Sequence, residues 1–283
     1  SYDGTTTLSS GDRTLTASTV TLNAVTGGSN ALTITGNLDL DGAISGVTNM
    51  SVSGTSNIGA DVTTTGTQSY TGTTTVSASS TLIGTEISAA AIVLNDDLEI
   101  RNSNNSTLAS VISGTGALTK SGSGALTLRG VNTFDGDLTI SAGTLFAGLA
   151  ADSGNQVIEN NVTVSGGTLS GGATIGGNVT VATANLAPGN SIGTLTIDGN
   201  VTLGDNSTTT IEFNGTTSDK VVVSGNITLA GALVLEPANT TYSDATLTIF
   251  DGSGGSGNSL SGTFASTTVS NSSYLGDATT SIS

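Results

Sequence analysis

Carboxylates are the side chains of this 283-residue sequence whose spacing could support chemistry. Asp39 and Asp41 alternate along a short apolar segment, which would place both on one face of a strand. A second group consists of Asp96, Asp97 and Glu99. Paired carboxylates serve glycoside hydrolysis, but neither group has a Trp, Tyr or Phe close by in the sequence to carry a sugar ring. We therefore interpret both groups as solvated turn residues and expect no catalytic residue.

Two residue types that dominate enzyme sites are missing, because the sequence contains neither His nor Cys. Catalysis by Ser-His-Asp or Cys-His and the usual zinc sites are thereby excluded. Calcium is the one cofactor that stays open, since oxygen-rich turns at 95–97 and 198–200 could ligate it. The candidate ligands are Asp96, Asp97 and Asp198. Calcium binding by a Gly-Gly-x-Gly-x-Asp repeat is not expected, since Gly254–Gly257 is followed by Asn258 and Ser259.

The charge balance limits the partners, since 5 Lys and Arg stand against 21 Asp and Glu, for a net charge of −16. Such a chain is repelled by nucleic acid and by anionic membrane surfaces. No segment approaches the ~20 apolar residues of a membrane helix, so we expect no membrane insertion. The sequence starts at Ser1 without the basic and apolar regions of a signal peptide, and we expect that such a peptide has been removed. An extracellular or cell-surface location fits these features.

Apolar residues recur with a period of two, which predicts an all-β fold. Short examples are Leu32–Ile34, Leu126–Leu128 and Val162–Val164, in which Thr alternates with Leu, Ile or Val. We expect strands of three to five residues separated by corners rich in Gly and Asn, which tolerate left-handed backbone. The segment 86–94 is compatible with either a short helix or a strand.

A turn-plus-strand unit made of Asn and an apolar strand repeats along the second half of the sequence. It occurs at Asn161, Asn178, Asn200 and Asn226, with spacings of 17, 22 and 26 residues. A period near twenty with short strands predicts a solenoid whose insertions lie in the corner loops. An up-and-down barrel or a sandwich is the alternative, but regular hairpin spacing is not evident.

The segment 114–145 resembles the autotransporter-associated β-strand repeat. Its first half matches at Leu118, Lys120, Gly122, Gly124, Leu126, Leu128 and Gly130, and its second half at Asn132, Phe134, Gly136, Ile140, Gly143 and Leu145. Asp137 departs from the pattern. We interpret Lys120 and Lys220 as exposed or ion-paired, and the five Phe residues as core fillers or coil caps.

Other segments resemble the same class of protein. Asn185–Leu195 is similar to a coil common near the end of autotransporter passengers, and Thr63–Gly72 is similar to repeats of filamentous-haemagglutinin-type adhesins. The resemblance implies a right-handed parallel β-helix exported to the surface of a Gram-negative-type bacterium, without catalysis in the repeats. A translocator barrel is not recognisable, so we expect a cleaved passenger, a fragment, or a protein exported by another route.

The expected organisation is N-terminal adhesin-like coils over 1–113, the repeat over 114–145 and C-terminal coils over 146–283, in one continuous solenoid. Three functions stay open: a structural or adhesive surface protein, a subunit of an extracellular filament or biofilm matrix, and a polysaccharide-active enzyme or glycan binder. The first two are favoured, with no enzyme activity. The expected partners are further copies of the chain, joined head to tail or laterally, and an unidentified surface ligand.

Overall fold

The computed structural model describes residues 2–149, 156–238, 246–252 and 258–270. These residues form strands joined by turns, and none of them is helical. No helix long and apolar enough to cross a membrane occurs in these ranges. The chain divides into two compact units, Ser1–Gly143 and Thr144–Ser283, which are described separately.

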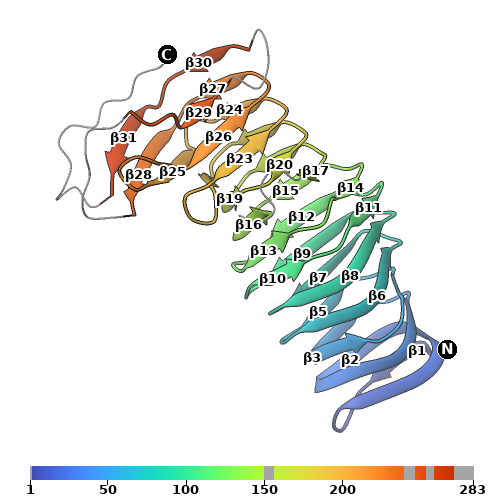
Figure 1. The fold of residues 1–283 in the computed structure, drawn as a ribbon. Coiled ribbons are helices and arrows are strands. Elements are labelled where there is room, and N and C mark those ends of the chain that lie inside the picture. Colours follow the sequence, from blue (N-terminus) through green and yellow to red (C-terminus); the bar gives the residue numbers. More distant parts are fainter. Residues whose placement is uncertain (1, 150–155, 239–245, 253–257, 271–283) are drawn as a thin grey trace. The chain divides into compact units, whose positions relative to one another are not determined.

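The first unit is a stack of parallel strands (Figure 1). Its strands are β1 (Tyr2–Thr7), β2 (Arg13–Leu40), β3 (Ile44–Val52), β4 (Ser56–Ile58), β5 (Val62–Thr64), β6 (Gln68–Val76), β7 (Ser80–Gly84), β8 (Ile87–Leu94), β9 (Leu98–Asn102), β10 (Ser106–Leu108), β11 (Ile112–Gly114), β12 (Leu118–Ser121), β13 (Ala125–Leu128), β14 (Thr133–Phe134) and β15 (Leu138–Ile140).

The second unit repeats the same architecture. Its strands are β16 (Thr144–Ala147), β17 (Gln156–Ile158), β18 (Val162–Val164), β19 (Thr168–Gly171), β20 (Thr174–Ile175), β21 (Val179–Val181), β22 (Asn185–Pro188), β23 (Thr194–Ile197), β24 (Val201–Leu203), β25 (Thr208–Phe213), β26 (Lys220–Val223), β27 (Ile227–Leu229), β28 (Ala232–Pro237), β29 (Phe250–Asp251), β30 (Leu260–Gly262) and β31 (Ser266–Val269).

Strand pairing confirms the predicted parallel β-solenoid. In the first unit Leu98 of β9 is in register with Leu118 of β12, which is in register with Leu138 of β15. In the second unit the strands that follow the Asn units, β18, β21, β24 and β27, pair in parallel in that order. The period near twenty residues is therefore one coil, and the barrel or sandwich alternative is wrong.

Strand length differs from the prediction in the first unit. β2 spans 28 residues where strands of three to five were expected, and β8 makes the ambiguous segment 86–94 a strand. β2 continues through the corners of its coil because its pairing with β3 persists there, with register shifts between Thr26 and Leu32.

The core of each unit is a thin column of Val, Ile and Leu side chains. Alternate residues of each short strand point inward, as in β18, where Val162 and Val164 are buried and Thr163 between them is half-buried. Stacking puts like residues above one another, so each apolar side chain is covered by the coils on either side. This arrangement removes apolar surface from water with no need for large aromatic residues.

Two polar residues of the interior, Gln68 and Tyr70, hydrogen-bond to each other. Tyr70 is fully buried and donates its hydroxyl to Oε1 of Gln68 at 2.9 Å. The amide of Gln68 donates to the carbonyls of Val62 and Ile83 at 3.0 and 2.7 Å. Burial raises the pKa of Tyr70, so its hydroxyl stays a donor over the physiological range.

The asparagines of the repeated unit form a ladder that joins successive corners of the second unit. Oδ1 of Asn161 accepts hydrogen bonds from the backbone N–H and from Nδ2 of Asn178, both at 3.0 Å. Asn178 accepts the same two bonds from Asn200, and Asn200 accepts the backbone N–H of Asn226 at 2.7 Å. The ladder holds coils of unequal length in one register.

The repeat residues recognised in the sequence pack in two ways. Leu126, Leu128, Phe134, Ile140 and Leu145 are buried. At Gly122, Gly124, Gly136 and Gly143, a Cβ would lie within 2.5 Å of backbone atoms of the neighbouring coil. Asn132 is fully buried, and its Oδ1 accepts the N–H of Ile112 at 2.9 Å, which fixes one corner on the preceding coil.

The interpretation of Lys120 as exposed or ion-paired is wrong. Lys120 is fully buried, and its Nζ donates to the carbonyls of Ser121, Gly122 and Ala142 at 2.5, 3.0 and 3.2 Å. Burial lowers the pKa of Lys120 to about 8. Lys220 matches its interpretation, since it forms an ion pair with Asp251 at 2.6 Å.

Candidate functional site

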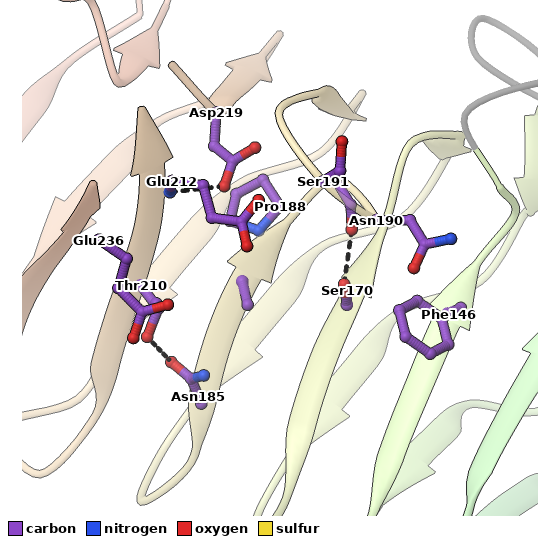
Figure 2. A pocket seen from close by; sticks show the side chains of 12 residues that line it. Phe146, Ser170, Asn185, Pro188, Asn190, Ser191, Thr210, Glu212, Asp219 and Glu236 are labelled. Atoms are coloured by element: carbon purple, nitrogen blue, oxygen red, sulfur yellow. Dashed lines mark hydrogen bonds between the residues drawn. The ribbon is translucent and has the colours of Figure 1, made fainter. Parts of the chain in front are cut away.

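A hollow of about 370 Å³ on the second unit gathers side chains from five stacked strands, β16, β19, β22, β25 and β28 (Figure 2). Its walls include Phe146 from β16, Asn185 from β22, Thr210 and Glu212 from β25 and Glu236 from β28, together with the turn 188–191 and Asp219. We call it the Glu212 hollow. The sequence separates these residues widely, and the stacking of coils brings them together.

The two glutamates of the hollow are in register on neighbouring strands. Glu212 of β25 pairs with Glu236 of β28, so both side chains leave the sheet on the same face at the strand spacing of ~4.8 Å. Glu212 is half-buried and Glu236 is exposed. Among the described residues, neither carboxylate has a hydrogen bond or an ion pair. The hollow therefore presents two unsatisfied acceptors close together.

Asp219 lies behind the glutamates and is 2% exposed. Its Oδ1 accepts the backbone N–H of Gly193 at 2.9 Å, and its Oδ2 accepts that of Glu212 at 2.8 Å. Burial raises the pKa of Asp219 to about 6; the two N–H bonds oppose this shift, and the charges of Glu212 and Glu236 add to it. Asp219 thus fixes the loop at Gly193 against β25, and both of its oxygens are used in doing so.

Neutral polar groups and one aromatic ring complete the hollow. Thr210 donates to Oδ1 of Asn185 at 3.0 Å, which orients the amide and leaves its Nδ2 without a partner in the described part of the chain. Ser170 donates to the carbonyl of Gly189 at 2.6 Å and holds the turn that carries Asn190. Figure 2 shows the ring of Phe146 beside Asn190 at the wall of the hollow.

Phe146 departs from the interpretation of the Phe residues as core fillers or coil caps. Phe134 and Phe213 are buried, as expected of core fillers. Phe250 and Phe264 are half-buried and pack on each other, with ring centroids 6.2 Å apart. Phe146 points outward between the buried Leu145 and Ala147, and it is half-buried at the hollow.

The carboxylates singled out in the sequence lie elsewhere. Asp39 of β2 accepts a hydrogen bond from Nδ2 of Asn57 at 2.8 Å, and Asp41 follows the end of β2. Asp96 accepts the N–H of Asp97, which in turn accepts the N–H of Ala117, both at 2.8 Å. The bond from Ala117 ties the corner at Asp96 and Asp97 to the next coil, as the interpretation of these two as turn residues predicts. Asp39 and Glu99 lie within β2 and β9, so the interpretation of them as turn residues is wrong.

The calcium candidates serve corners as well. Asp198 accepts a long hydrogen bond from the hydroxyl of Ser224 at 3.4 Å. In the described ranges, no group of three or more acidic residues is placed to hold a metal ion. Calcium binding by Asp96, Asp97 or Asp198 thus stays a prediction.

Sequence reasoning missed the Glu212 hollow. The alternation Thr208–Phe213 places Thr210 and Glu212 on the outer face, but which outer residues of other coils lie beside them depends on loop length. The sequence held one signal of the glutamate pair: Glu212 and Glu236 each follow an apolar residue near the end of an apolar segment.

Residues 118–145 match the passenger-associated-transport repeat, a 28-residue part of a parallel β-solenoid. This match confirms the resemblance found at the same residues in the sequence. The chain is also 32% identical over 194 residues, 60% of its length, to the adhesin BmaC autotransporter of Brucella suis biovar 1 (strain 1330). It is 45% identical over 84 residues, 30% of its length, to an extracellular serine protease of Serratia marcescens.

The chain spans 6% of the length of the Brucella adhesin and 8% of that of the Serratia protease. The chain is therefore similar to autotransporter passengers, and the similarity covers only a small part of each relative.

Proposed function

We propose that this chain is a stretch of a secreted or surface-exposed passenger of a Gram-negative bacterium, and that its solenoid serves adhesion and structure without catalysis. The observation that carries the proposal is the transport repeat at 118–145 within a chain that is similar to an adhesin over 60% of its length. A solenoid suits this task because it holds an extended surface away from the cell with little core.

The similarity to a serine protease does not extend the proposal to proteolysis. The chain contains no His, so a Ser-His-Asp triad cannot be assembled from its own residues. The Glu212 hollow holds carboxylates, amides and hydroxyls. Asp219, whose pKa burial raises, has both carboxylate oxygens bound to backbone N–H groups. These features support binding over turnover.

Adhesion is tested with beads coated with the purified chain and applied to an epithelial monolayer and to a bacterial polysaccharide layer. Beads coated with the heat-unfolded chain and with albumin are the controls. We expect the folded chain to hold more beads than either control on at least one surface. Adhesion would be refuted if, on both surfaces, the folded chain held no more beads than the controls. Release of peptides from casein by the chain would refute the non-enzymatic assignment.

Head-to-tail association of copies of this chain is a second candidate. Its support is the fold itself, because parallel strands that pair coil to coil along the chain can pair in the same way with strands of a second copy. Sedimentation of the chain over a hundredfold range of concentration, followed by electron microscopy, tests it: fibres support association, and a single species at all concentrations refutes it.

A further inference from the structure

We propose that the Glu212 hollow binds a short stretch of an uncharged polysaccharide. The inference names a ligand for the adhesive solenoid proposed above, and it rests on that function only for the surface location. The observation that carries it is one hollow on the outer face of the strands, with an outward-facing aromatic ring on β16 and planar hydrogen-bonding side chains on the three coils from β22 to β28.

The extent of the hollow fits a few successive sugar units, because Phe146 and Glu236 lie four strands apart, or about 19 Å at the strand spacing of ~4.8 Å. Its volume of about 370 Å³ falls in the lower part of the range of about 300–1,000 Å³ that is usual for small-molecule sites. The hollow is open to solvent along the outer face of the strands, so a polymer can enter by one unit and continue over neighbouring coils. A deep, enclosed cavity would instead suit a free small molecule.

Phe146 supplies the apolar contact that a sugar ring requires. The face of an aromatic ring carries partial negative charge and attracts the weakly positive C–H groups of a sugar. Phe146 is placed for this role because Leu145 and Ala147 on either side turn inward, and the phenyl ring is left partly exposed on the outer face. Filling the hollow would remove this apolar surface from water.

The polar groups farther along the hollow match the hydroxyls of successive sugar units, and each hydroxyl can donate one hydrogen bond and accept others. Glu212 and Glu236 supply acceptors at the strand spacing of ~4.8 Å. Nδ2 of Asn185 and the amide of Asn190 supply donors, since neither has a hydrogen-bond partner among the described residues. Thr210 orients Asn185, so part of the site is arranged before a ligand arrives.

The charges of the hollow select against acidic sugars. Three carboxylates line it, and no Lys or Arg does. A uronic or sialic acid would bring a further negative charge to Glu212 and Glu236, whereas the hydroxyls of a neutral hexose or an N-acetylated hexosamine carry none. A metal ion is a poorer fit, because Asp219 is already fully engaged with the backbone.

The test is isothermal titration of the purified chain with cellotetraose and chitotetraose as neutral probes and tetragalacturonate as the acidic probe. We expect at least one neutral probe to bind and the acidic probe not to bind. Phe146→Ala should weaken the neutral interaction by about tenfold or more. The double substitution Glu212→Gln and Glu236→Gln should weaken it as well, since an amide is a poorer acceptor than a carboxylate.

Glu159→Gln is the matched control, because Glu159 is an exposed glutamate of the same unit that does not line the hollow. The affinity of Glu159→Gln for the neutral probe should equal that of the unchanged chain. Phe146→Leu keeps an apolar side chain and checks folding, since it should preserve the melting temperature and still lose affinity. The inference is overturned if neither neutral probe binds, if the acidic probe binds as well as the neutral ones, or if Phe146→Ala binds normally.

The outcomes separate this inference from the proposed function. Bead adhesion that persists without any sugar binding would leave the adhesive function intact and remove its sugar ligand. Release of new reducing ends from a bound probe would support the binding site and refute the non-enzymatic assignment.

Discussion

Nζ of Lys120 donates to the carbonyl of Ala142 on the next coil at 3.2 Å, so one buried amine joins two successive coils of the transport repeat. The same nitrogen also donates to the carbonyls of Ser121 and Gly122 within its own corner. One side chain thereby supplies hydrogen-bond donors to three carbonyls at the corners of the two coils. The position needs a long side chain that ends in several donors, and Lys is the residue that supplies three.

Replacing Lys120 with Met should destabilise the first unit although the two side chains have similar length. Met fills the same space but leaves the three carbonyls without their donor, at a cost of about 2–4 kcal/mol in unfolding free energy. Urea unfolding followed by circular dichroism measures this cost. Lys220→Met serves as the control, since Lys220 is partly exposed and its ion pair with Asp251 should contribute no more than about 1 kcal/mol. Equal losses in the two variants would contradict the role of Lys120.

The buried Lys120 should also make stability depend on pH. Its pKa is about 8 in the folded chain and 10.5 for an unburied lysine, so between these values the unfolded chain binds a proton that the folded chain does not. Stability then rises with pH, by up to about 2 kcal/mol from pH 7 to pH 9.5. We expect this rise in the unchanged chain and its absence in Lys120→Met, measured by urea unfolding at each pH. A rise in stability of the same size in the unchanged chain and in Lys120→Met would show that other groups cause it.

The asparagine ladder should contribute measurably at each rung. Asn200→Ala removes the acceptor of the Asn226 N–H and the donor to Asn178, and it should lower the unfolding free energy by about 1 kcal/mol. Thr202→Ala, two residues further along the same coil and outside the ladder, should change it by less than about 0.5 kcal/mol. Thermal unfolding of the two variants compares them directly, and an equal effect would show that the ladder adds nothing beyond local strand preference.

Much of the fold could be predicted from the sequence, because its signals are local. Alternation at Val162–Val164 indicates a strand with two inward residues, and the recurrence of Asn161, Asn178 and Asn200 indicates corners of successive coils. The structure confirms both, and it shows that these asparagines also bond to one another. The burial of Lys120 could have been predicted as well, since it shares the inward face of β12 with Leu118.

The Glu212 hollow could not be predicted, because it depends on register between distant coils. The pairing of β16 with β19, β22 and β25 in turn sets which outer residues stand beside one another. The turns between these strands differ in length, so no fixed spacing in the sequence relates Phe146 to Glu212. The same holds for the length of β2, which follows from pairing that persists through a corner.

Gly143 should tolerate no side chain, because it closes the corner that Lys120 holds. Its φ is +70°, and a Cβ there would lie 2.4 Å from the carbonyl oxygen of Gly122 and 2.8 Å from Nζ of Lys120. Gly143→Ala should therefore lower the unfolding free energy by more than about 1 kcal/mol. Gly4→Ala is the control, since a Cβ at Gly4 meets nothing within 4 Å. A melting temperature of Gly143→Ala equal to that of the unchanged chain would contradict the close packing at this corner.

Asp219 should make the second unit gain stability as the pH falls. Its pKa is raised from 3.8 to about 6, so in this interval the folded chain binds a proton that the unfolded chain does not. The favourable contribution is full below about pH 3.8 and is lost as the pH rises through 6, which amounts to about 2 kcal/mol between pH 4 and pH 7. The comparison with Asp219→Asn isolates the contribution of this carboxylate from that of the other acidic residues. The difference in unfolding free energy between the two chains should shift by that amount in favour of the unchanged chain as the pH is lowered from 7 to 4. A difference that stays constant with pH would show that the carboxylate of Asp219 is ionised normally in the folded chain.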